Sequence, residues 1–225
     1  MDIWQLLSIF GFGFVLGLEH ALDPDHVVAV STIVSQEKNF RKSTLLGMFW
    51  GAGHTATLLI VAMIVLLLKV TIPAKIALSF EFIVGIMLVI LGINVFRKLF
   101  VHDFHWHRHE HDAHLHAHLH SHKESPAHKH NHITFAMGMV HGLAGSAALM
   151  LLVVATLTSL WQGIIYVLIF GLGSVLGMMI VSGLIGLPFF LTKNIKKLNR
   201  AIQSIAGIVS ITLGVIIMYQ IIIII

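Results

Sequence analysis

Six long apolar runs constrain this chain more than any other feature of its sequence. Each run can cross about 30 Å of hydrocarbon, which takes roughly 20 helical residues. They lie at about residues 3–35, 44–70, 76–100, 133–157, 161–192 and 201–225. Soluble domains have about one quarter charged residues, whereas 57% of these residues are hydrophobic and only 11% are charged. We therefore predict an all-α polytopic membrane protein with about six transmembrane helices.

The basic residues are spread unevenly over alternate loops, and this distribution predicts the orientation. If the N-terminus lies outside, twelve of the 14 Lys and Arg residues are cytoplasmic, and only Lys69 and Lys75 are outside. Cytoplasmic loops of membrane proteins are enriched in Lys and Arg. The net charge of +4 therefore reflects topology, and nucleic acid is not an expected partner. We expect an integral protein of a prokaryotic cytoplasmic membrane, with both termini outside.

The two halves of the sequence resemble each other. In the third run "FIVGIMLVILGINVF" aligns with "SIAGIVSITLGVIIM" in the sixth, at an offset of 122 residues that keeps two glycines in step. At nearly the same offset His20 pairs with His141, and His54 pairs with Ser174. Because three spans is an odd number, the second half enters the membrane from the opposite side, as in the inverted repeats of many secondary transporters.

This repeat predicts the division of the chain. Residues 1–100 and 133–225 are the expected three-helix repeats, and the loop at 101–132 is expected in the cytoplasm. Thirteen of the 17 histidines lie in this loop, whose composition cannot bury a core and predicts disorder without a ligand. Free imidazole is mostly neutral at about pH 7, so we interpret the loop as a metal buffer or sensor, with a solvated linker as the alternative.

The first run contains a polar cluster, "GLEHALDPDH" at 17–26. A charge at mid-membrane costs about 2.5–3.5 kcal/mol on insertion scales, so its carboxylates require a bound cation, a basic neighbour or protonation. No Lys or Arg lies in this run. Pro24 cannot donate to the His20 carbonyl and disfavours helical geometry at Asp23. We therefore predict that the first helix is broken at Pro24, with Asp25 and free carbonyls facing one cavity.

The residue types at this break favour a transition-metal ion. Imidazole and carboxylate ligands suit nickel, cobalt or zinc better than magnesium or Cu(I), and the chain has no cysteine. Four histidines lie in predicted spans, which favours one shared site: His20, His26, His54 and His141. In the alternative interpretation the polar residues only end a helix near the membrane surface, with Asp23 or Asp25 as its cap.

Three motifs resemble the nickel/cobalt transporter superfamily. "HALDPDH" at 20–26 has its H-x4-D-H pattern, and "GAGHT" at 51–55 is similar to its second-helix Gly-His-Ser/Thr motif. "HGLAGSAAL" at 141–149 is similar to the urease-accessory-type nickel permeases within it. Six spans, instead of eight in longer members, indicate this shorter branch.

This resemblance implies roles for individual residues. It implies that His20, Asp25 and His26 recognise the metal, with Asp23 and His54 as further ligands or as supports for them. The repeat adds His141. The candidate metal-binding residues are therefore His20, Asp23, Asp25, His26, His54 and His141.

The same resemblance implies transport of a divalent ion, nickel or cobalt, which is the substrate and not a resident cofactor. Import needs no coupled ion, because a dication moving through about 100 mV, negative inside, gains about 4.6 kcal/mol, or more than three decades of concentration. Proton-coupled efflux is the alternative. Expected partners are the metal ion, the lipid bilayer, and a cytoplasmic metal chaperone or a urease or hydrogenase maturation system.

Two other classes of protein remain open. Four histidines in a helix bundle can ligate two haems, as in an electron-transfer protein, although the clustered carboxylates argue against this. An intramembrane metalloenzyme is the other class, but the sequence has no H-E-x-x-H motif and no G-x-x-x-x-G-K-[ST] phosphate loop. We therefore expect a transporter and not an enzyme.

Overall fold

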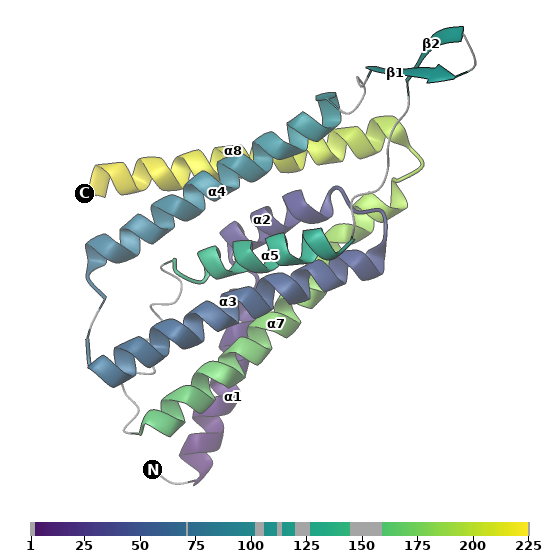
Figure 1. Cartoon of the computed structure of the whole chain (residues 1–225). Coiled ribbons are helices and arrows are strands. Elements are labelled where there is room, and N and C mark those ends of the chain that lie inside the picture. Colours follow the sequence, from purple (N-terminus) through teal and green to yellow (C-terminus); the bar gives the residue numbers. More distant parts are fainter. Residues whose placement is uncertain are drawn as a thin grey trace.

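The computed structural model describes residues 3–70, 72–101, 106–111, 114–119, 127–144 and 159–224. It is a bundle of helices (Figure 1), and the chain is a polytopic membrane protein as predicted. Five of the described helices are long and apolar enough to cross a membrane. They are α1 (Ile3–His20), α3 (Phe40–Leu68), α4 (Ala74–Val101), α7 (Leu160–Leu191) and α8 (Lys196–Ile224).

The first predicted span is divided in two. Helix α1 ends at His20, and the short helix α2 (Pro24–Val34) begins at Pro24. Asp23 has φ −55° and ψ 137°, an extended conformation that a following proline imposes. The predicted break at Pro24 is thus confirmed. Proline suits the first helical position because its missing N–H would have no partner there.

The fourth predicted span and the histidine loop differ from expectation. Helix α5 (Ala127–His141) begins earlier than the predicted span at 133–157, and residues 145–158 lie outside the described part of the chain. Within the loop, strands β1 (Trp106–His111) and β2 (His114–Leu119) form an antiparallel hairpin where we predicted disorder. Histidine at alternate positions has the two-residue period of a strand, which agrees with this pairing.

The helices lie in layers around α2. Helices α2 and α5 lie between the α4–α8 pair and α3 (Figure 1). The start of α1, the end of α8 and the connection between α3 and α4 lie at one end, called here the C-terminal end of the bundle. The β1–β2 hairpin lies at the other end, called here the hairpin end.

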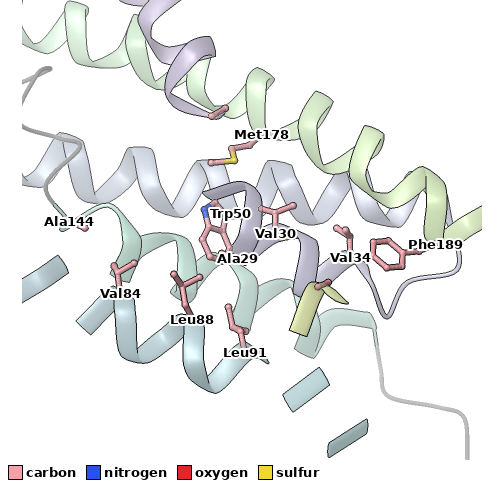
Figure 2. Close-up of a cluster of buried hydrophobic side chains, with 12 residues drawn as sticks. Ala29, Val30, Val34, Trp50, Val84, Leu88, Leu91, Ala144, Met178 and Phe189 are labelled. Atoms are coloured by element: carbon pink, nitrogen blue, oxygen red, sulfur yellow. The ribbon is translucent and has the colours of Figure 1, made fainter. Parts of the chain in front are cut away.

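Apolar side chains enclose α2. Figure 2 shows Val30 and Val34 of α2 beside Trp50 of α3, Leu88 of α4 and Phe189 of α7. All five side chains are buried. His26, in the first turn of α2, is fully buried as well.

The main helix contacts occur twice, as a repeat predicts. A methyl group on Gly17 of α1 would overlap the carbonyl oxygen of Phe170 in α7, and one on Gly138 of α5 would overlap that of Trp50 in α3. At these two contacts, the glycines of α7 and α3 also lie so close to a facing carbonyl oxygen that an added methyl group would overlap it. Small residues at such crossings let helix backbones approach closely. The α1–α7 and α3–α5 crossings, each of which joins one half of the chain to the other, are therefore equivalent contacts.

The pair of helices that were aligned in the sequence shows the same symmetry. The glycines of α4 and α8 meet in antiparallel order: Gly85 lies against Gly214, and Gly92 against Gly207. In the repeat, Gly85 corresponds to Gly207 and Gly92 corresponds to Gly214. Each glycine of α4 thus contacts the repeat equivalent of the other α4 glycine. The division of the chain into repeats at residues 100 and 132 stays a prediction.

These crossings predict a clear difference between two glycines of α1. Gly17→Ala places a methyl group against the Phe170 backbone, and overpacking of this kind costs about 1–3 kcal/mol. Gly11 has no atom within 4 Å of an added Cβ, so Gly11→Ala is the matched control and gains helix propensity. In detergent, we expect Gly17→Ala to lower the melting temperature by several degrees and Gly11→Ala to leave it unchanged or raised. Equal effects would contradict the close crossing.

Candidate metal centre

Four helices bring ionisable side chains to the break in the first span. His20 is the last residue of α1, Asp25 and His26 lie in the first turn of α2, and His54 lies in the middle of α3. His141 is the last residue of α5. Helix C-termini carry partial negative charge, and two of them end here. The backbone thus contributes to a site that favours a cation.

Three histidines form the first group of possible ligands. Nε2 of His20 lies 2.9 Å from Nε2 of His54, and the His26 ring centroid is 4.6 Å and 5.0 Å from those of His20 and His54. All three side chains are buried, and their ligand atoms lie within 4.8 Å of one another. Tetrahedral metal–nitrogen bonds of about 2.0–2.1 Å require nitrogens about 3–3.5 Å apart. The 2.9 Å between the His20 and His54 nitrogens is close to this separation.

Asp25, His26 and His141 form the second group. Oδ2 of Asp25 lies 2.8 Å from Nε2 of His141, and its Oδ1 lies 3.2 Å from Nδ1 of His26. The Asp25 carboxylate also accepts a hydrogen bond from the His26 backbone N–H, and the N-terminus of α2 stabilises its negative charge. His26 belongs to both groups, so the two sets of ligands overlap at one imidazole.

Three buried ring nitrogens have no hydrogen-bond partner among the described residues. They are Nε2 of His26, Nδ1 of His54 and Nδ1 of His141. A buried polar atom without a partner costs about 1–3 kcal/mol, so an arrangement that leaves three of them together is unfavourable unless a ligand satisfies them. A metal ion is a ligand of that kind, because it binds neutral imidazole nitrogen.

The six predicted residues differ in how they lie at the break. His20, Asp25, His26, His54 and His141 come together in the two groups. Asp23 lies at the edge: its Oδ2 is 2.9 Å from Nδ1 of His20, and its side chain is 38% exposed. In this position Asp23 orients the His20 ring and fixes which nitrogen faces the other histidines.

Sequence reasoning missed two residues beside the site. A pocket that reaches Asp25 is also lined by Glu81 of α4 and Gln220 of α8. Glu81 is an isolated carboxylate inside an apolar run, and we assigned it no role from sequence. Such a residue within a membrane span suggests a functional position by default, and this signal could have identified it.

Comparisons with known proteins agree with the membrane architecture. A family model described as "Cytochrome C biogenesis protein transmembrane region" matches residues 27–216. The urease accessory protein UreH of Bacillus sp. (strain TB-90) is 44% identical over 98% of this chain and 94% of its own length. Two Arabidopsis thaliana proteins, Chloroplast protein FOR GROWTH AND FERTILITY 1 and 2, are 29% and 27% identical, over 90% and 93% of this chain and 56% of each relative. No solved structure matches the chain.

The overlap of the two groups predicts an order among histidine variants. An ion that binds only the folded bundle stabilises it, by about 2.7 kcal/mol at 100 times the dissociation constant. We expect nickel to raise the melting temperature of the purified protein by several degrees. His26→Ala removes a ligand from both groups and should abolish the rise, whereas His54→Ala should leave part of it.

The exposed His132, which belongs to neither group, provides the matched control. His132→Ala should show the full rise in melting temperature. Equal rises in His26→Ala and His132→Ala would mean that nickel stabilises the chain from outside this centre.

Proposed function

The chain belongs to the cytochrome c biogenesis protein transmembrane-region family and is a relative of a bacterial urease accessory protein, and we propose that it transports a divalent transition-metal ion. The predicted resemblance to the urease-accessory branch is confirmed by that relative. One observation carries the proposal. Four buried histidines and a carboxylate from four helices converge where α1 and α5 both end inside the bundle.

The chemistry of these groups supports nickel as the substrate, with cobalt as its nearest competitor. Four imidazoles and one carboxylate form a borderline donor set, and divalent ions late in the first transition series bind imidazole well. A single carboxylate gives a hard cation such as magnesium too few oxygen ligands. The urease accessory name of the relative and the sequence resemblance to nickel permeases favour nickel.

A carrier must release its ion as well as bind it, and the position of the centre suits that task. The ligands lie at the break in the first span, between the α1–α7 and α3–α5 crossings. Transporters built from inverted repeats bind their substrate at such broken helices, where the repeats meet. Inward movement is our preferred direction, because the membrane potential alone drives a dication inward. Proton-coupled efflux through the same side chains is the second direction that the test must distinguish.

The geometry does not favour haem binding. The rings of His20 and His26 meet edge to face, with centroids 4.6 Å apart, and those of His26 and His141 are 4.1 Å apart. Imidazoles in direct contact leave no slot for a macrocycle between them. The chain also lacks cysteine, so its own side chains cannot carry out thiol–disulfide exchange.

The histidine loop has a supporting role in this proposal. With the N-terminus outside, the loop lies in the cytoplasm and buffers the ions that the bundle releases. A cytoplasmic metal chaperone or a urease or hydrogenase maturation system is the proposed recipient. The orientation, in a prokaryotic cytoplasmic membrane, follows from the distribution of Lys and Arg.

Radioactive nickel uptake into proteoliposomes with an imposed potential tests the proposal. With about 100 mV, negative inside, the driving force on a dication is about 4.6 kcal/mol, so wild-type vesicles should accumulate nickel and lose it when the potential is collapsed. His20→Ala/His26→Ala should reduce uptake to the level of empty vesicles. His132→Ala should transport as the wild type does.

The same assay separates the two directions. Nickel movement that ignores the potential and follows an imposed pH gradient would show proton exchange and overturn the uptake mechanism in favour of efflux. Vesicles that accumulate none of nickel, cobalt and zinc would contradict transport altogether.

A further inference from the structure

A pocket of about 200 Å³ reaches the metal centre at Asp25. Asp25, which contacts both His26 and His141, lies at its inner end, and its side chain is 24% exposed. Glu81 and Gln220 line the same pocket. None of the described lining residues is basic.

The two helices that form the pocket present a regular face to it. On α4, Leu78, Glu81 and Val84 follow one another at three-residue spacing, which places them on one side of the helix. On α8, Ile217, Gln220, Ile221 and Ile224 have the same helical spacing. These residues lie near the start of α4 and the end of α8, so the pocket lies toward the C-terminal end of the bundle.

Toward the hairpin end, described apolar side chains cover the centre. Val30, Val34 and Leu91 are at most 6% exposed and belong to the packed layer around α2 (Figure 2). Beyond this layer, Lys98 near the end of α4 donates a hydrogen bond to Gln36, just after α2. The two sides of the centre therefore differ among the described residues: one has a pocket that contains Asp25, Glu81 and Gln220, and the other has a tightly packed apolar layer.

We propose that this pocket is the entrance through which the cation reaches Asp25, and that Glu81 is the first carboxylate to bind it. This inference rests on the proposed transport function and adds a route and a capture residue to it. A carboxylate in an apolar pocket holds a dication strongly, because the low dielectric increases the attraction. Gln220 lines the same pocket, and its carboxamide oxygen supplies a neutral ligand.

A kinetic test separates capture from structural support. Glu81→Gln keeps the size of the side chain and removes its charge. Nickel uptake into proteoliposomes should show KM raised about five- to tenfold, with the maximal rate unchanged, because saturating nickel fills the pocket without the carboxylate. Glu81→Asp should restore most of the affinity. Glu37→Gln makes the same change near the hairpin end and should leave KM unchanged.

A labelling test needs no change at Glu81 and uses the absence of cysteine in the chain. Leu78→Cys places a thiol in the pocket, and Lys75→Cys places one on the exposed surface three residues earlier in the same helix. A bulky, membrane-impermeant thiol reagent should label both variants from the same side. It should stop nickel uptake in Leu78→Cys only.

The outcomes distinguish this inference from the function on which it rests. If the wild type takes up nickel, a normal KM in Glu81→Gln would contradict the proposed entrance. Full activity in labelled Leu78→Cys would contradict it too, and neither result would contradict transport itself. If the wild type transports no metal, the proposed function fails instead. Labelling of Leu78→Cys and Lys75→Cys from opposite sides would also contradict an entrance at the C-terminal end.

Discussion

Hydrocarbon offers no hydrogen bonds, so a broken transmembrane helix must be covered by protein. The whole structure depends on covering the turn between His20 and Pro24. Helix α7 lies directly across this turn: a methyl group on Gly177 would touch the Ala21 side chain and the Leu18 backbone. A glycine thus lets a neighbouring helix pack closely against one side of the break.

The second half uses the same device for its own half-helix. Gly142 follows the last residue of α5 and lies against the backbone of His54 in α3. The two arrangements are not identical, however, because α3 presents His54 where α7 presents Ser174. Both side chains are fully buried, but imidazole binds a transition metal far better than a hydroxyl. The repeat thus builds the scaffold twice, and this difference places a candidate metal ligand at this position of α3 and not of α7.

Local features of the sequence predicted much of this arrangement. The apolar runs gave the long helices, and Pro24 gave the break, because proline acts on its immediate neighbours. The contact between Asp25 and His141 joins positions 116 residues apart, and His141 was a candidate because it lies in a predicted span and pairs with His20 in the repeat. Glu81 was missed because its relation to Asp25 depends on how the α4–α8 pair packs on α2, and helical periodicity does not contain that information.

The two ends of the α4–α8 pair also carry different charges at equivalent positions of the repeat. At the offset of 122, Glu81 corresponds to Gln203, and Gln220 corresponds to Lys98. The positions that line the pocket thus carry a negative charge, while their equivalents toward the hairpin end carry a positive one. Lys98 already joins α4 to the residue after α2 on that side. A carboxylate attracts a dication and an ammonium group repels it, so these two side chains make the two ends of a symmetric scaffold electrostatically different.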